Sequence, residues 1–503
     1  MSVLNEYIKE QLAAGNELSA GMVAYVANLE EVSKVDKNVV ASVIKELEDQ
    51  RSHLKMIASE NFCSLSTQLA LGNLLTDKYA EGFPDHRYYA GCDNVDTIEA
   101  QACKEATDLF GAEHAYVQPH SGADANMVAY WAILSKKIQE PWMAEQDVKD
   151  VSKLSRDKWD ELRAKLGNQK LLGLNYYSGG HLTHGYRHNL SARMFDSFTY
   201  DVDPETQILD YDALRKQAEE IKPTILLGGY SAYPRKINFR IMREIADSVG
   251  AVFMVDMAHF AGLVAGKEFT GDFDPIKWAD VVTTTTHKTL RGPRGGMILC
   301  KKEYAEWVDQ GCPLVLGGPL AHSIAAKAIA FKEANTPAFE DYASQIVKNT
   351  KALAAGLAKN GVNMTSGGSD NHLIVTDITN FGLTGRQAEN AVRAAGITLN
   401  RNSIPFDPNG AWYTSGLRFG TPALTTLGMK EEEMTEIAEV VSLILKNTTA
   451  NTIATGANAG KKSKAKHTTD EAVLADARKR VTALLDRFVL YPEIDTAVLK
   501  KLI

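Results

Sequence analysis

Cysteine and surplus positive charge are what this sequence has least of. Only five cysteines occur in 503 residues, at positions 63, 92, 103, 300 and 312, and no two of them show C-x-x-C spacing. A sparse, odd set of this kind indicates reduced thiols in a cytoplasmic protein and argues against a disulfide framework or a zinc ribbon. The 63 acidic and 55 basic residues leave a formal charge of −8, so the basic surface of a nucleic-acid-coating protein is not expected.

Long hydrophobic runs and a secretion signal are also missing. No stretch stays apolar for the roughly 18 residues of a membrane span, and the best candidate, AVFMVDMAHFAGLVAG, is broken by Asp256 and His259. The first twenty residues lack a cationic segment followed by an apolar core, so no signal peptide is expected. The 37 glycines and 15 prolines are an ordinary share, which excludes collagen-like or wholly disordered architecture. We therefore expect a soluble cytoplasmic protein without membrane partners.

The order of the hydrophobic patterns predicts an α/β protein with a second, smaller domain. Between about residues 105 and 300, short β-branched or apolar runs such as AVFMVD and VVTTTT alternate with helical patterns. Strands of this kind indicate a mostly parallel sheet covered by helices on both faces. After about residue 335 the pattern becomes that of a smaller α+β domain. We predict a helical arm over 1–50, a large domain over 51–335 and a small C-terminal domain over 336–503.

Two segments interrupt this organisation. Residues 136–171 are charged and mostly helical, and we expect a surface insertion there. Residues 450–470 are rich in Thr, Ala, Gly and Lys and poor in large apolar groups, so we expect a flexible loop. This loop contains GANAGKKS, which is close to a phosphate-binding P-loop. Its first glycine is one residue too near the GK pair and no apolar strand precedes it, so we predict no nucleotide site.

The densest chemical signal is VVTTTTHKTLRGPRGG, in which a predicted strand leads to Lys288 and an arginine- and glycine-rich loop. A desolvated ammonium is costly, and nearby cations lower the pKa of an amine, so Lys288 is a candidate Schiff-base lysine. The strand before it ends at Asp256, and ligands of open α/β sheets bind beyond the carboxyl ends of neighbouring strands. Pyridoxal phosphate requires this pair, because the Asp keeps the pyridine nitrogen protonated while the Lys holds the aldehyde. Taken alone, Lys288 could be an exposed lysine at the end of a strand, and Asp256 could be the N-cap residue of a helix.

A phosphate-binding turn is expected where the short strand AYVQ leads into a helix that begins at Ser121 and Gly122. The free N–H groups and the dipole of a helix N-terminus favour an anion, although an ordinary cap is the alternative. Arg418 lies between glycines in TSGLRFGTPA, on a strand-like run. Its guanidinium suits a bidentate grip on a substrate carboxylate, with a surface arginine as the alternative.

Two polar clusters lie in loops punctuated by glycine. SGGHLTHG places His181 and His184 three residues apart, but no H-E-x-x-H pattern and no nearby cysteine accompany them, so we predict no metal site. His181 is either a ring-stacking group or a histidine satisfied by its neighbours. KYAEGFPDHRYYAG supplies Glu81 as a candidate acid/base carboxylate. The same loop carries three phenols that could bind phosphate or substrate, Tyr79, Tyr88 and Tyr89.

From about Met56 to Thr425 the chain resembles the serine hydroxymethyltransferase family. The resemblance is carried by long motifs in one order, among them IASENF, DKYAEGFPDHRYYAGCDNVDTIE, LFGAEHAYVQPHSGADANM, SAYPR, VDMAHFAGLVA and GGPL. It implies a fold-type-I pyridoxal phosphate enzyme, with a seven-stranded, mostly parallel sheet in its large domain. The implied reaction moves the hydroxymethyl carbon of serine to tetrahydrofolate and gives glycine and 5,10-methylenetetrahydrofolate.

The resemblance also implies a role for each motif residue. Expected to act in catalysis are Lys288, Glu81, His259 and Tyr89. Expected to hold pyridoxal phosphate are Ser121, Gly122, His181, Ser231, Asp256, His259 and Lys288, joined across a dimer interface by Tyr79 and Gly318. Expected to bind the amino acid are Ser59, Tyr89 and Arg418. Expected to bind folate are Tyr88, Tyr176, Gly180, His181, Leu182 and Asn400, with Tyr176 standing where family members often carry Leu. A homodimer or a dimer of dimers with shared active sites follows.

Two other functions stay open at this point. A folate-independent pyridoxal phosphate aldolase or amino-acid racemase would use the same lysine, but it has less need of Glu81, Tyr88 and Asn400. A non-catalytic RNA- or partner-binding protein would use the lysine-rich run at 461–466, but it would not need Lys288, Asp256 and Glu81 together.

Overall fold

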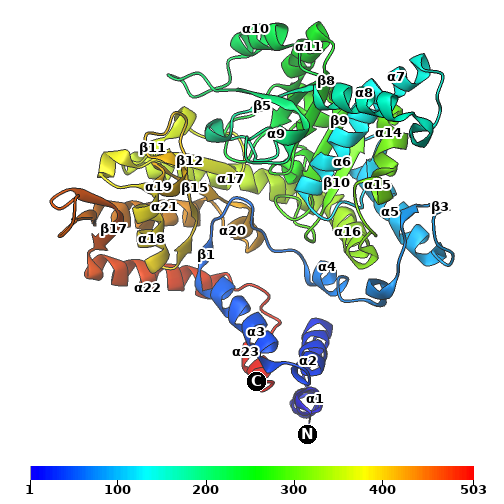
Figure 1. Ribbon diagram of the computed structural model, residues 1–503. Coiled ribbons are helices and arrows are strands. Elements are labelled where there is room, and N and C mark those ends of the chain that lie inside the picture. The colour runs from blue at the N-terminus through cyan, green and yellow to red at the C-terminus, as the bar shows by residue number, and fades with distance from the viewer. Residues whose placement is uncertain (1) are drawn as a thin grey trace.

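The computed structural model describes residues 2–503, and its largest feature is a seven-stranded sheet (Figure 1). The strand order is β4-β10-β9-β8-β7-β5-β6. Only parallel pairings join β9, β8, β7, β5 and β6, whereas β10 runs antiparallel to both β9 and β4. The strands are β4 (His114–Tyr116), β5 (Lys170–Leu174), β6 (Asp196–Tyr200), β7 (Ile225–Gly229), β8 (Val252–Asp256), β9 (Val281–Thr285) and β10 (Gly296–Cys300). The predicted mostly parallel α/β sheet is confirmed.

Helices cover both faces of this sheet, which is why its strands carry no polar alternation. In β8, Phe253 and Val255 pack into one core cluster, while Val252 and Met254 pack into the cluster on the opposite face. The first cluster includes side chains of α5 (Asp93–Phe110), α11 (Phe239–Val249), α16 (Ala321–Ala334) and α17 (Pro337–Lys359). The second includes α6 (Gly122–Leu134) and α14 (Lys302–Asp309). Helix α11 ends at Gly250, whose φ of 71° is the left-handed conformation that glycine allows.

A second, four-stranded antiparallel sheet lies in the C-terminal part of the chain, with the order β11-β12-β15-β14. Its strands are β11 (Asn363–Met364), β12 (Leu373–Asp377), β14 (Asn400–Asn402) and β15 (Gly416–Gly420), and its core helices are α18 (Gly385–Ala394), α21 (Glu431–Lys446) and α22 (Glu471–Arg487). Strand β1 (Leu54–Lys55) pairs in parallel with β13 (Ile397–Thr398). Leu54 and Met56 therefore belong to the core of the small sheet, although the sequence placed them in the large domain.

The two ends of the chain pack on each other. Helices α1 (Val3–Ala13), α2 (Ala20–Ser33) and α3 (Lys37–Ser52) share a hydrophobic cluster with α23 (Thr496–Lys500), and Figure 1 shows both termini beside these helices, away from the large sheet. Arg51 adds three hydrogen bonds, to the carbonyls of Leu490, Tyr491 and Ile494. The C-terminal segment therefore anchors the N-terminal arm.

The loop predicted over 450–470 is wrong for about half of that segment, because 450–452 and 462–469 belong to the two strands that form there. Strands β16 (Thr448–Thr452) and β17 (Lys462–Thr469) form an antiparallel hairpin. Helix α18 holds β17 through the side chain of Gln387, which donates to the carbonyls of Ser463 and Lys466. Backbone pairing and these polar contacts replace the large apolar side chains whose absence suggested a loop.

The predicted insertion is helical but ends earlier than expected. It forms a π-helical turn at 135–139, α7 (Glu140–Glu145) and α8 (Arg156–Gly167), which pack around Trp142, Met143 and Leu162. Lys170 and Leu171 already belong to β5, because both pair with β6 in the central sheet.

The remaining short elements connect these units. They are α4 (Leu65–Leu69), β2 (Gly82–Phe83), β3 (His86–Arg87), α9 (Ser191–Met194), α10 (Tyr211–Ile221), α12 (Ala261–Ala265), α13 (Pro275–Trp278), α15 (Gly311–Leu314), α19 (Gly410–Tyr413) and α20 (Pro422–Thr426). Within residues 2–503, no helix combines the length and the apolar character needed to cross a bilayer.

Candidate active site

Two adjoining cavities, of about 550 and 250 Å³, lie beyond the carboxyl ends of the central strands. Five of the predicted site residues line both of them: Ser59, His181, Ser231, His259 and Lys288. The larger cavity is also lined by Tyr176, Gly180, Leu182, Asn400 and Arg418, and the smaller by Ser121, Gly122 and Asp256. The fold thus gathers residues from positions 59 to 418 around one continuous space.

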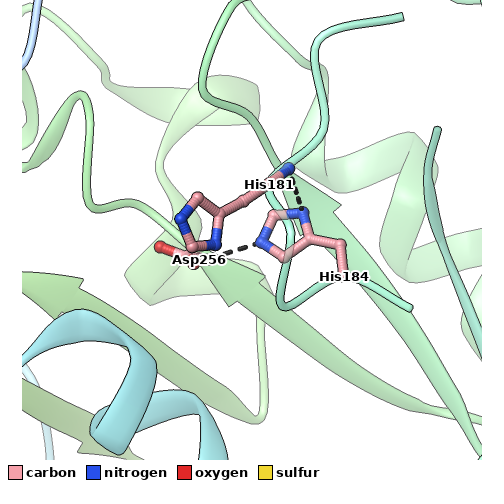
Figure 2. A group of neighbouring side chains, drawn as sticks. All are labelled: His181, His184 and Asp256. Atoms are coloured by element: carbon pink, nitrogen blue, oxygen red, sulfur yellow. Dashed lines mark hydrogen bonds and ion pairs between the residues drawn. The ribbon is translucent and has the colours of Figure 1, made fainter. Parts of the chain in front are cut away.

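Asp256 is the last residue of β8 and is 6% exposed. Its carboxylate accepts hydrogen bonds from Asn126 Nδ2 at 2.9 Å, His184 Nε2 at 3.1 Å and the Ala258 amide at 3.0 Å. Figure 2 shows the His184 ring directed at this carboxylate. Burial by itself would raise the pKa of Asp256, but the bonds from His184 and Asn126 outweigh burial, and the pKa lies far below its usual value. The carboxylate is therefore held ionised.

Lys288 follows β9, the strand next to β8, and its ammonium is buried at the junction of the two cavities. Burial lowers the pKa of Lys288 to about 8. The positive charges of Arg418 and Arg294 lower this pKa further, whereas the negative charge of Asp256 raises it. An amine with this pKa is a nucleophile near neutral pH.

The predicted phosphate-binding turn forms the start of α6. Ser121 is the N-cap residue, and its hydroxyl accepts a hydrogen bond from the Asp124 amide at 3.1 Å. A Cβ at position 122 would lie 2.7 Å from Cγ2 of Thr285, so only glycine fits there without displacing β9. Ser121, Gly122 and Ala123 at the start of α6 line the smaller cavity, where the free N–H groups of a helix N-terminus favour an anion.

Lys327 of α16 binds the backbone beside this turn, a role that the sequence did not indicate. Its Nζ donates to the carbonyls of Val117, Pro119 and Gly296 at 2.6, 3.0 and 2.9 Å. Burial lowers the pKa of Lys327 to about 7, while three carbonyl acceptors match the three hydrogens of an ammonium. The strand before Ser121 is thereby tied to the end of the loop that carries Lys288.

His181 lines both cavities, and burial lowers its pKa to about 4, so its ring is neutral. Its Nδ1 is 2.7 Å from the Thr183 hydroxyl. Ligand atoms of His181, His184 and Asp256 all lie within 4.8 Å of one another, a spacing that a metal ion could use (Figure 2). His184 and Asp256 already bond each other in this arrangement.

Arg418 of β15 reaches from the small sheet into the larger cavity. Its Nε donates to Asn400 Oδ1 at 3.0 Å and its Nη1 to the Ser231 carbonyl at 2.7 Å. Burial lowers the pKa of Arg418 to about 10, so the guanidinium stays charged at neutral pH. Two of its nitrogens are thus held by protein groups, and Nη2 is left for an anionic ligand.

The other predicted residues are not brought into these cavities within one chain. Glu81 accepts hydrogen bonds from the hydroxyls of Tyr89 at 3.0 Å and Tyr79 at 3.4 Å. The ring of Tyr79 also lies against Gly318, where an added Cβ would be 3.4 Å away. Tyr79, Tyr88 and Tyr89 are 57%, 69% and 47% exposed, so a cluster of phenols around a carboxylate stands open at the surface.

The family model for serine hydroxymethyltransferase matches residues 32–156 and 162–441 of the chain. The chain belongs to the serine hydroxymethyltransferase family. Curated proteins named serine hydroxymethyltransferase are also similar to the chain over most of its length. The chain is 56% identical to the protein of Treponema pallidum over 499 residues, covering 99% of this chain and 86% of the relative. It is 56% identical to the protein of Salinispora tropica, over 95% of this chain and 99% of the relative. It is 49% identical to the protein of Chlamydia muridarum, over 99% of this chain and 99% of the relative.

Serine hydroxymethyltransferases are pyridoxal-phosphate-dependent transferases that interconvert serine and glycine with tetrahydrofolate as the one-carbon carrier, and identity at this level extends that activity to this chain. None of these matches supports the folate-independent alternative.

The residues around the smaller cavity fit the family's cofactor. Asp256 is buried and ionised, yet no Lys or Arg in residues 2–503 forms an ion pair with it. A buried anion in this position is stabilised by a cationic ligand, such as a protonated pyridine ring. The N-terminus of α6, which could hold a phosphate, and Lys288, which could hold an aldehyde, border the same cavity.

Glu81 is supported by a buried network of hydrogen bonds and ion pairs that was not evident from the sequence. Arg87 donates to the carbonyls of Ala80 and Gly82, both at 2.9 Å, and these two residues flank Glu81. The same guanidinium is paired with Asp96 at 2.7 Å and with the buried Glu99 at 2.5 Å. A sequence signal existed, because Glu99 lies in the buried stripe of α5 among small apolar residues. Arg87 therefore binds the backbone on both sides of Glu81.

Proposed function

We propose that the two adjoining cavities are the site at which this protein transfers the hydroxymethyl carbon of serine to tetrahydrofolate. One observation carries this proposal: Asp256 and Lys288, which close the neighbouring strands β8 and β9, face the same buried space. The test is an assay of glycine-dependent consumption of methylenetetrahydrofolate by the cofactor-loaded protein. Absence of that activity would refute the proposal, and a folate-independent aldolase or racemase activity would replace it.

Pyridoxal phosphate, when bound, supplies an electron sink for the bonds at the substrate alpha carbon. We assign Lys288 to its aldehyde, Asp256 to its pyridine nitrogen and Ser121 with Gly122 to its phosphate. His181 would stack on its ring, and Ser231 and His259 would bond near its phenolic oxygen. His184 acts one step away by keeping the Asp256 carboxylate oriented, and this role explains the close group of ligand atoms without a metal ion.

The amino acid and the folate would share the larger cavity. The free Nη2 of Arg418 and the hydroxyl of Ser59 line this cavity and would bind the substrate carboxylate. Tyr176, Gly180, Leu182 and Asn400 line the remaining volume, where a flat heterocycle can stack on Tyr176 and bond to Asn400. A reaction without folate would leave this part of the larger cavity without a ligand.

The acid/base carboxylate would come from a second subunit. Glu81 and Tyr89 are outside the cavities of their own chain, and Tyr79, Tyr88 and Gly318 stand with them at the surface. A homodimer that inserts this cluster into the partner's cavity would complete each site. Five free cysteines fit a cytoplasmic location for such an enzyme.

Binding of pyridoxal phosphate to the apoprotein should become faster as the pH rises through about 8, the pKa of Lys288. Only the neutral amine attacks an aldehyde, and the neutral fraction grows as pH passes upward through the pKa and then levels off. The measurement is the rate at which visible absorption appears after mixing, on both sides of that pH. A rate that falls or stays constant with rising pH would contradict the assignment.

Asp256→Asn should lower kcat by roughly 10²- to 10³-fold, because the neutral amide no longer stabilises positive charge on the pyridine ring. The KM for serine should change much less, since Arg418 and Ser59 are untouched. Asp280→Asn is the matched control, because Asp280 is also buried in the large sheet region but pairs with Arg243 and Lys301 outside the cavities. Equal losses in both variants would mean that the effect is one of stability.

A further inference from the structure

A second histidine stands behind His259 and was not singled out by the sequence. His372 directly precedes β12 of the small sheet, and its Nε2 lies 3.2 Å from Nδ1 of His259, which follows β8 of the large sheet. His372 is 0% exposed and His259 is 3% exposed. The neighbouring Asn371 fixes this segment by donating to the Tyr230 hydroxyl at 3.0 Å and the Tyr233 carbonyl at 3.1 Å. The two imidazoles are thus held together from separate sheets.

Both rings are neutral at physiological pH. Burial lowers the pKa of His372 to about 3, with further repulsion from Arg418 and Lys288. Burial and the same two cations also lower the pKa of His259 well below its usual value. A neutral imidazole carries one N–H and one unprotonated nitrogen. The contact at 3.2 Å therefore needs one ring to donate and the other to accept.

The other nitrogen of His372 decides the direction. His372 Nδ1 is buried and has no hydrogen-bond partner. If His259 donated, the proton of His372 would have to be on this Nδ1, which would leave a buried N–H unpaired. Buried N–H groups without a partner are rare because their desolvation is not compensated. If His372 donates from Nε2, its Nδ1 carries only a lone pair, and His259 keeps its proton on Nε2.

We propose that His372 is a positioning residue that fixes the tautomer of His259, so that His259 always presents an Nε2–H donor to the cavities. The inference deepens the proposed function and rests on it for the ligands. His259 lines both cavities, and the groups expected beside it, a phenolic oxygen and a substrate carboxylate, are hydrogen-bond acceptors. A donor that is already oriented before the ligand arrives loses no orientational freedom when the ligand binds.

Neutron diffraction from deuterium-exchanged crystals of the cofactor-loaded enzyme tests the tautomers directly. Deuterium is expected on Nε2 of both His372 and His259, and none on either Nδ1. Deuterium on His259 Nδ1 would overturn the proposal. This readout does not depend on turnover, so an enzyme without transferase activity would refute the proposed function and still report the tautomers.

Two variants give the kinetic test. His372→Phe keeps a flat ring but removes the donor, whereas His372→Gln can place an amide N–H near the original Nε2. We expect kcat/KM to fall roughly 10- to 100-fold in His372→Phe, as for other lost partners of oriented histidines, and to recover largely in His372→Gln. Cofactor absorption and the melting temperature check that both variants are folded and loaded. Wild-type kcat/KM in a loaded His372→Phe enzyme would overturn the positioning role, and if neither variant folds the neutron result decides.

Discussion

Lys288→Ala is expected to abolish the visible absorption of the lysine-bound cofactor and to lower kcat by at least roughly 10³-fold, as losses of covalent catalytic residues do. No other lysine lines either cavity in residues 2–503. Lys327, the other deeply buried lysine in this region, points at three backbone carbonyls and cannot substitute for it. The measurements are the absorption spectrum of the purified variant and its turnover with serine and tetrahydrofolate.

Lys301→Ala is the matched control for this change. Lys301 also follows a strand of the large sheet, β10, but its ammonium pairs with Asp280 away from the cavities. We expect a wild-type spectrum and turnover from it. An unchanged spectrum in Lys288→Ala would contradict the assignment of the cofactor lysine.

Mixing two inactive variants is expected to restore activity. Glu81→Gln should be nearly inactive because it removes the carboxylate that we propose transfers a proton, an effect of roughly 10²- to 10⁴-fold. When Glu81→Gln subunits are refolded together with Lys288→Ala subunits, half of the dimers pair unlike chains. In each such dimer one site combines an intact Lys288 with an intact partner Glu81, so about a quarter of wild-type activity should return. The measurement is specific activity of the mixture against each variant alone.

Lys288→Ala mixed with Asp256→Asn is the control for this experiment. Both residues belong to the cavity of their own chain, so every mixed dimer carries a defect in each site and no activity should return. No recovery with Glu81→Gln would show that Glu81 serves its own subunit, whereas recovery in the control would show that Lys288 and Asp256 of one chain serve different sites. Sedimentation of the wild type provides a further check, because a fully active monomer is incompatible with shared sites.

Much of the large sheet could be predicted from local sequence. The runs that became β8 and β9 are buried on both faces and carry no charged residue before Asp256, because each strand is covered by helices on both sides. The ends of these strands predicted where Asp256 and Lys288 would lie, and the Ser-Gly pair predicted the start of α6. Such features depend on a few consecutive residues, and those residues are visible in the sequence.

The misses share a different physical cause. The hairpin of β16 and β17 looked like a loop because its stability comes from pairing with a strand and with Gln387 of a distant helix. Strand β1 was assigned to the wrong domain because its partner β13 lies more than 300 residues later in the chain. Secondary structure that depends on a remote partner leaves little local signal.

The sequence by itself determined which chemical groups this protein has and where along the chain each of them ends a strand or begins a helix. That was sufficient to predict the cofactor lysine, its carboxylate partner and the phosphate turn. Only the tertiary structure decided how those groups are held: Arg87 around the backbone of Glu81, Lys327 beneath the phosphate turn and His372 behind His259. The reason is that each of these contacts satisfies a buried polar group, and burial is a property of the packed chain.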